Sequence, residues 1–325
     1  MILLAGGAGR RGRALVEPLA ALGTPVRILS RNPSRADASI SENVEKMVGD
    51  VRVASSLNAA LAGVETVISA VTGFGPGGDG PRKVDLEGNR NLIDVAEAAG
   101  VKHFIMVSIH GATANHPMEL YRAKFRAEVR LRASRLEWTI IRPTVFMELW
   151  AGIIGDPLFK TGTATVFGRG ENPINFVSVR DVARFIEQAV VDPLFRGRTL
   201  DVGGPENVSV NRLVKIIAES NGRPAKARHI PVGLLRLAAS ALRPFRPDIA
   251  GLLQAAVLMD TTNMRFEPAE VMAGPRVRPT QLAGVVRRSS GIPITACDMA
   301  RLTKPGPPGH KLGSLNRAST VRADG

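Results

Sequence analysis

The chain has 325 residues, enough for one large or two modest domains with a substantial hydrophobic core. Lysine and arginine outnumber acidic residues by 43 to 29, but aromatics make up only 4% and no basic block contains them, so we expect no specific nucleic-acid binding. The single cysteine excludes an internal disulfide, no apolar run could span a bilayer and no secretion signal is evident, which together favour the cytoplasm.

Short apolar runs alternate with helical patterns over the first 142 residues. Strands are predicted at 1–5, 25–31, 46–51, 66–71, 103–109 and 138–142, with helices at 10–22, 57–61, 84–99 and 120–134. Buried strands that alternate with helices are typical of βαβ units, and right-handed crossovers wind such units into a parallel sheet. We therefore predict an α/β fold with a doubly wound parallel (Rossmann) sheet.

The alternation breaks after Pro143. Residues 175–204 resume a strand and a helix, whereas 144–174 are mixed and 205–288 combine apolar helical stretches with several prolines. We predict a Rossmann domain from 1–143 and 175–204, and a smaller substrate or lid region from 144–174 and 205–288. The remaining residues, 289–325, lose periodicity and are expected to form a disordered polar tail.

The stretch "GGAGRRG" follows the first predicted strand and opens the first predicted helix. Gly6, Gly9 and Gly12 would let backbone amides approach a pyrophosphate at the positive end of that helix, with Arg10 and Arg11 adding positive charge. A dinucleotide site is therefore predicted, although an ordinary glycine-rich turn is the alternative interpretation.

The second strand favours NADP(H) over NAD(H). Sites for NAD usually place an acidic residue near the end of this strand, whereas this chain has Ser30 and Arg31 there. An arginine can pair with a 2′-phosphate that a carboxylate would repel, and Arg35 is a weaker candidate for the same role. The alternative is that Arg31 only ends an exposed strand.

With these motifs placed, the chain resembles the atypical short-chain dehydrogenase/reductase superfamily, in particular its NmrA-like NAD(P)-binding proteins. The resemblance covers most of residues 1–215 and rests on "MILLAGGAGRRG", "VRILSRNPSR", "LAGVETVISA", "VDLEGNRNLIDVAEAAGVKHFIMVSIHGA", "YRAKFRAE", "LEWTIIRPTVFME", "INFVSVRDVARFIEQAVVDP" and "LDVGGPENVSV". It implies the fold and an NAD(P) cofactor, but no particular substrate.

The resemblance also implies which residues border the cofactor, most of them at strand ends: Asp50, Val51, Ala70, Val71, Ser108, Lys124, Pro143 and Thr144. The pair after the third strand would border the adenine, the pair after the fourth would line the cleft, and the pair after the sixth would begin a loop over the nicotinamide. Ser108 would lie beside the nicotinamide and Lys124 would hydrogen-bond its ribose, so these two are the catalytic candidates.

The usual proton donor of this superfamily is a tyrosine four residues before the lysine. Leu120 occupies that position here, and Tyr121 is displaced from it by about 100° around the helix. The resemblance therefore leaves two functions open. One is an NADPH-dependent reductase of a small carbonyl or alkene substrate, and the other is a non-catalytic NADP(H)-binding redox sensor or assembly factor with a protein partner.

Two further features of the sequence concern a membrane anchor and a metal site. The stretch "GLLRLAASALRPFRP", from Gly233 to Pro247, is either a basic amphipathic membrane anchor or, more commonly, part of a substrate-lid helix. His110, His116 and Glu119 could be drawn together as metal ligands, but they lack the spacing of a metal site, and we predict none.

Overall fold

The computed structural model describes residues 1–9, 12–32, 42–220, 222, 226–267, 279–282, 284 and 285. All of them belong to one compact unit that extends from Met1 to Ile294. The candidate residues Arg10, Arg11 and Arg35, and the expected polar tail at 289–325, lie outside the described residues.

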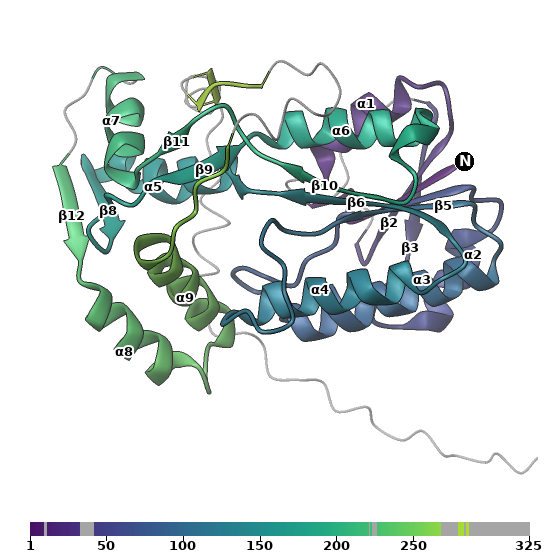
Figure 1. The fold of residues 1–325 in the computed structure, drawn as a ribbon, viewed down its shortest axis with the longest axis horizontal. Coiled ribbons are helices and arrows are strands. Elements are labelled where there is room, and N and C mark those ends of the chain that lie inside the picture. The colour runs from purple at the N-terminus through teal and green to yellow at the C-terminus, as the bar shows by residue number, and fades with distance from the viewer. Residues whose placement is uncertain are drawn as a thin grey trace, which may run out of the picture. The chain divides into compact units, whose positions relative to one another are not determined.

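A seven-stranded parallel sheet forms the centre of the described part of the chain (Figure 1). Its strands run in the order β10-β6-β5-β4-β1-β2-β3. Their bounds are β1 (Ile2–Ala5), β2 (Val26–Ser30), β3 (Val44–Val48), β4 (Thr66–Ser69), β5 (His103–Val107), β6 (Glu137–Pro143) and β10 (Arg198–Val202). The order steps outward from β1 in both directions, so the predicted doubly wound fold is confirmed.

Helices cover both faces of this sheet (Figure 1). On one face lie α1 (Arg13–Ala20) and α6 (Val179–Val191), and on the other lie α2 (Asn58–Leu61), α3 (Asn89–Ala98) and α4 (Glu119–Arg132). Side chains alternate along a strand, so Ile2 and Leu4 of β1 pack in the core under α1 and α6, while Leu3 and Ala5 pack under the other three helices. Burial on both faces explains why the central strands β1 and β4 are short, largely apolar runs.

Two expected elements differ in detail. The helix predicted at 84–99 is an α-helix only from Asn89, because it begins with a π-helical turn, η3 (Arg82–Gly88). In this turn the amide of Asn89 donates to the carbonyl oxygen of Asp85 (2.7 Å). The strand predicted at 46–51 ends at Val48, because the chain then turns and the backbone N–H of Asp50 donates to Ser56 Oγ (3.0 Å) ahead of η2 (Ala54–Leu57).

The chain after Pro143 supplies most of a second group of elements: β7 (Val145–Phe146), α5 (Met147–Thr161), β8 (Thr163–Phe167), β9 (Ile174–Val177), β11 (Asn207–Val208), α7 (Val210–Ser220), β12 (Lys226–Ile230), α8 (Val232–Leu242) and α9 (Pro247–Thr261). Strands β11, β9 and β7 form one small sheet, and β12 pairs with β8 in another. A separate apolar core joins α5 and α7 to these strands, and α8 packs against α9. No described helix is both long and apolar enough to cross a membrane.

Candidate functional site

A cleft lies at the carboxyl edge of the central sheet. Because all seven strands run parallel, their carboxyl ends meet along one edge, and several of the expected site residues gather there. The cleft is lined by Ala70, Val71, Ser108, Lys124, Pro143 and Thr144. Elements from the later part of the chain close it with apolar side chains, among them Trp150 of α5 and Leu258 of α9. The result is a largely apolar cavity with a few polar groups at its base.

The glycine turn leads from β1 into α1. Gly6 has a φ of +94°, and a Cβ there would lie 2.8 Å from the carbonyl oxygen of Ala70 on the neighbouring strand. A Cβ on Gly12 would lie 2.1 Å from the oxygen of Gly6, so neither position admits a side chain. Gly9 stays exposed between them, and the first turn of α1 has no acidic residue. An exposed glycine next to a helix N-terminus whose first turn carries no acidic residue suits a pyrophosphate.

Lys124 is buried beneath the strand ends. Its ammonium donates to the carbonyl oxygens of Val71 and Val107, each at 2.9 Å, and forms an ion pair with Asp85 Oδ1 at 3.1 Å. Asp85 is fully buried on η3, and its other oxygen accepts the backbone N–H of Gly73 (2.8 Å). Two hydrogens of the ammonium are thus donated to backbone carbonyl oxygens, while Asp85 supplies a counter-charge whose Oδ1 accepts no hydrogen bond from the described residues. The lysine links the ends of β4 and β5 to η3 at the base of the cleft.

Ser108 is held by a second buried carboxylate. Its hydroxyl donates to Glu128 Oε1 (2.5 Å), one helical turn after Lys124 on α4. Glu128 also accepts two hydrogen bonds from Arg142 (2.9 and 2.6 Å) and one from Arg132 (3.0 Å). The hydroxyl has one hydrogen, and because that hydrogen is directed at Glu128, the free lone pairs of Ser108 make it an acceptor toward the cleft.

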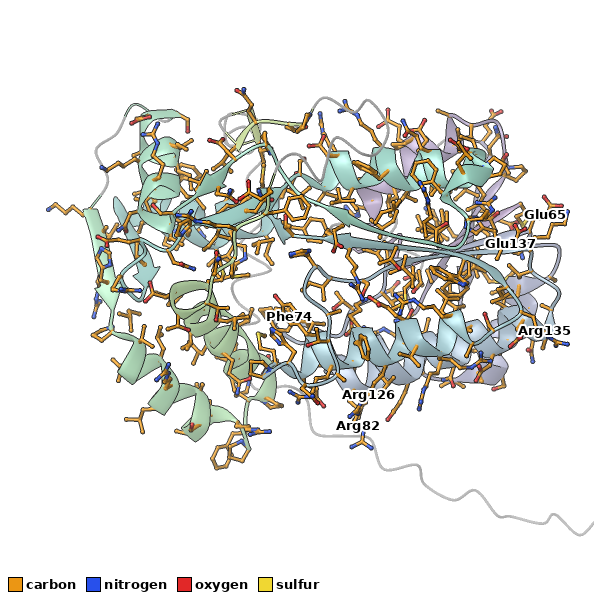
Figure 2. All side chains as sticks on the ribbon, viewed as in Figure 1. Glu65, Phe74, Arg82, Arg126, Arg135 and Glu137 are labelled. Carbon is orange, nitrogen blue, oxygen red and sulfur yellow. The ribbon has the colours of Figure 1, made fainter. Side chains whose placement is uncertain are left out.

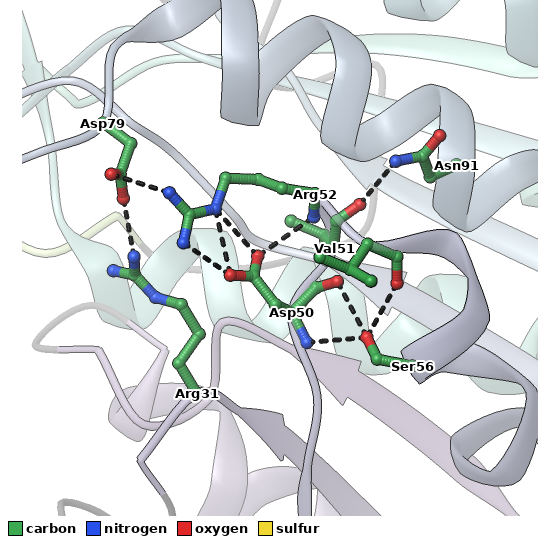
Figure 3. Close-up of polar contacts among 8 residues, drawn as sticks. Arg31, Asp50, Val51, Arg52, Ser56, Asp79 and Asn91 are labelled. Atoms are coloured by element: carbon green, nitrogen blue, oxygen red, sulfur yellow. Dashed lines mark hydrogen bonds and ion pairs between the residues drawn. The ribbon is translucent and has the colours of Figure 1, made fainter. Parts of the chain in front are cut away.

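The edge near β2 and β3 carries a chain of ionic contacts (Figure 3). Arg31, just after β2, pairs with Asp79 Oδ2 (2.6 Å), and Arg52 pairs with the other oxygen of Asp79 (2.7 Å). Arg52 also holds Asp50 (2.5 Å), and this hydrogen-bonded guanidinium lowers the pKa of the Asp50 carboxyl. Val51 is buried and its carbonyl oxygen accepts the Asn91 amide (2.9 Å). The carboxylate of Asp79 thus lies between two guanidinium groups.

Asp79 belongs to a glycine-rich loop, residues 73–80, that also reaches α9. The backbone N–H of Gly77 donates to Asp248 Oδ2 (3.0 Å), and Arg246 pairs with the same carboxylate (3.2 Å). Phe74 of this loop lies between α4 and α9 and lines the cleft (Figure 2). The loop thus connects the pair of Arg31 and Arg52, at one end of the carboxyl edge of the sheet, to α9, which covers the other end of that edge.

The start of α4 brings Leu120 and Tyr121 into the same cleft as Lys124. Tyr121 lies one residue after the position of the usual proton donor, and its ring still lines the cleft. The ring stacks on His116, with centroids 3.8 Å apart, and burial raises the pKa of Tyr121 to about 12. The phenol is therefore neutral at physiological pH.

His110 and Glu119, the other two candidate metal ligands, do not form a group with His116. His110 Nδ1 lies 2.8 Å from Asp201 Oδ1, and Glu119 opens α4. Among the described residues, no three histidine, cysteine or acidic side chains are grouped to hold a metal ion.

Sequence patterns did not reveal several residues that shape this site: Arg52, Asp79, Asp85 and Glu128. The stretch 73–80 offered one signal, since it has five glycines and a single acidic residue. The two buried carboxylates offered none, because their partners are distant in sequence or become neighbours only in the folded helix.

A family profile described as NAD(P)H-binding matches residues 6–193, more than half of the chain. The chain belongs to this NAD(P)H-binding family. It is 26% identical over 279 residues to the NAD(P)H azoreductase of Xenophilus azovorans, covering 84% of this chain and 90% of the relative. It is also 26% identical over 265 residues to the photosystem II assembly factor Ycf39 of Trieres chinensis, covering 81% of this chain and 82% of the relative.

Solved structures share the fold of this NAD(P)H-binding protein. The NADPH-dependent quinone oxidoreductase of Escherichia coli, complexed with NADPH, superposes with a TM-score of 0.72 at 20% identity, covering 89% of this chain and 100% of that one. Triphenylmethane reductase of Citrobacter sp., complexed with NADP(H), gives 0.71 at 17% identity, with coverages of 89% and 99%. With the family match, these neighbours confirm the NAD(P)-binding Rossmann fold that the motifs implied.

Proposed function

We propose that this protein is an NADPH-dependent reductase of a small, apolar carbonyl or alkene substrate. The observation that carries the proposal is the apolar cleft at the carboxyl edge of the sheet, which surrounds the buried ammonium of Lys124. The relative named an azoreductase and the structural neighbour named a quinone oxidoreductase support a reductive reaction on an unsaturated substrate. The proposal includes a cytoplasmic location, supported by the single cysteine.

The residues of the cleft fit the cofactor. We assign the pyrophosphate to the turn of Gly6, Gly9 and Gly12, where exposed backbone meets the helix N-terminus. When bound, NADPH supplies the hydride. Pro143 and Thr144, at the end of β6, exclude water from the nicotinamide end, together with the apolar side chains of α5 and α9.

The preference for NADPH rests on the arginine pair. Arg31 and Arg52 both bind the carboxylate of Asp79, which supports their use as a site for a second anion, the 2′-phosphate. Asp50 and Val51 border the adenine in this proposal, and Ala70 and Val71 line the path toward the nicotinamide.

Lys124 and Ser108 are the proposed catalytic residues. Lys124 places a positive charge next to the strand ends, where it can exchange one carbonyl partner for a ribose hydroxyl. Ser108 accepts a hydrogen bond from a water molecule, because its own hydrogen is directed at Glu128. That water would supply the proton that accompanies the hydride from NADPH, leaving hydroxide that solvent neutralises. Tyr121 is not required, since Leu120 occupies the position from which the usual tyrosine acts.

A non-catalytic NADP(H)-binding regulator or assembly factor is the second candidate. Leucine at position 120 favours it, as do the two carbonyl oxygens and the Asp85 carboxylate that surround the ammonium of Lys124. The relatives named photosystem II assembly factors support a protein partner for such a role.

The test is NADPH oxidation with a panel of aldehydes, ketones, enones and quinones, alongside titration of both cofactors. We expect turnover with at least one apolar substrate, and a loss of NADPH affinity in Arg31→Ala that leaves NADH affinity unchanged. Tight NADPH binding without turnover on any class would instead favour the regulator. Equal loss of both cofactors in Arg31→Ala would contradict the assignment of the 2′-phosphate.

A further inference from the structure

Helix α8 presents an apolar stripe to solvent. Leu234 is 55% exposed, Leu237 is 68% exposed, and Phe245, just after the helix, is 80% exposed. At 100° per residue, Leu234, Leu237 and the exposed Ala241 fall within an arc of about 60°. The opposite side of α8 carries the buried Leu235 and Ala239. The stripe is therefore a second apolar face, which the contact with α9 leaves uncovered.

Positive charge flanks this stripe. Arg236 on α8 and Arg243, the residue that caps the helix at its C-terminus, are both exposed and lie on one side of the stripe, about 100–120° around the helix axis from Leu237. Within the described part of the chain neither forms an ion pair, and α8 itself contains no acidic residue. Arg246, by contrast, is neutralised by Asp248 at 3.2 Å. The apolar stripe and the two unpaired guanidinium groups thus form one exposed surface, which we call the α8 face.

We propose that the α8 face docks on an anionic phospholipid bilayer. Leucine and phenylalanine side chains gain free energy when they enter the acyl boundary, and flanking arginines remain at the level of the lipid phosphates. The two features occur together at one helix, with both arginines on its polar side, beyond the exposed Ser240, and none within the apolar arc. This is the arrangement of a helix that lies in the plane of the interface.

The charges also argue against a second copy of the chain as the occupant. A symmetric dimer formed through the α8 face would bring the same patch of both protomers together. Arg236 and Arg243 of each protomer would then meet their counterparts with no acidic residue of α8 to pair with. An anionic lipid surface supplies the missing negative charge without a matching shape.

Vesicle flotation of the full chain tests the proposal. We expect wild type to float with phosphatidylcholine vesicles that contain phosphatidylglycerol, to float far less with phosphatidylcholine alone, and to be released by salt. Arg236→Gln with Arg243→Gln should lower the partition coefficient by about fivefold for each arginine. Leu234→Ser with Leu237→Ser and Phe245→Ser should lower it by at least about tenfold.

Matched controls lie elsewhere on the surface. Leu194→Ser removes a side chain that is 76% exposed on η4 (Pro193–Phe195), and Arg82→Gln with Arg126→Gln removes two arginines that point away from the sheet (Figure 2). Both should float like wild type, and unchanged thermal unfolding should show that every variant is folded. Absence of wild-type flotation, or equal losses in the controls, would overturn the proposal. The proposal would also be overturned if the triple serine variant floated like wild type but no longer self-associated, because the α8 face would then bind a second copy of the chain.

Discussion

Asp79 competes for the arginine pair that we assign to the 2′-phosphate. In Asp79→Asn the two ion pairs, at 2.6 Å to Arg31 and 2.7 Å to Arg52, lose their anion, whereas both guanidinium groups stay in place. The variant should therefore bind NADPH more tightly than wild type and bind NADH equally well. The direction is informative, because most substitutions at a binding site weaken binding.

The magnitude follows from the exposure of the three side chains, which is 58% for Arg31, 32% for Arg52 and 31% for Asp79. At such exposure two unit charges about 4 Å apart interact by about 1 kcal/mol, and a phosphate carries up to about two charges. If Asp79 instead swings aside when NADPH binds, two exposed ion pairs are lost, each worth at most about 1 kcal/mol. Either route predicts a gain of about 1–2 kcal/mol, roughly five- to thirtyfold in Kd.

Fluorescence titration of NADPH and NADH against both proteins measures this gain. The matched control is Asp94→Asn on α3, which makes the same change in net charge but removes an ion pair with Arg130. If Asp79→Asn improves NADPH binding no more than Asp94→Asn does, the 2′-phosphate does not use this arginine pair. If NADH affinity rises equally, the effect comes from the loop and not from the phosphate.

Three further predictions concern the base of the cleft and the core. Lys124→Met should lower the free energy of unfolding by about 3–5 kcal/mol, because it strands the buried Asp85 carboxylate, and adding Asp85→Asn should recover most of the loss in urea titrations. Burial, with the charge of Arg196, lowers the pKa of His103 from 6.5 to about 3. Below pH 6.5 the imidazole is protonated in the unfolded chain but stays neutral in the folded protein. The contribution of His103 to the free energy of unfolding is therefore complete above pH 6.5 and falls by about 1.4 kcal/mol per pH unit toward pH 3. His103→Gln should remove this slope between pH 7 and 5, and an unchanged slope would assign it to other groups. Tyr121→Phe should slow single-turnover reduction by much less than the roughly hundredfold expected for a proton donor, and a larger loss at unchanged NADPH affinity would make Tyr121 that donor.

The central sheet could be predicted because its signals are local. Most strands of the sheet are short, largely apolar runs separated by helical patterns, so this alternation and the glycine turn after β1 indicate the fold. The π-helical turn at Arg82–Gly88 could not be predicted, since its pattern is that of an ordinary helix. The end of β3 was misplaced because the apolar Val51 prolongs the run, although the chain already turns at Asp50.

The candidate site was only partly accessible from the sequence. Residues at strand ends, such as Ala70 and Thr144, gather because parallel strands end together, and this follows from the strand pattern alone. No such rule predicts the ion-pair partners of the charged residues in the site. Asp79 and Arg31 are 48 residues apart in the sequence, and Asp85 and Lys124 lie on different helical segments. Each pair therefore forms only when the chain folds.

The glycine-rich loop 73–80 links the arginine pair to α9, so we expect binding at these two places to be coupled. Asp79 is held by the arginine pair, and Gly77, two residues earlier, is held by Asp248 at the start of α9. We expect a ligand that displaces Asp79 to alter the contact between Gly77 and Asp248, and a ligand that moves α9 to alter the position of Asp79. Thermodynamic reciprocity then requires that each ligand alter the affinity for the other by the same factor. The order in which the two arrive leaves that factor unchanged.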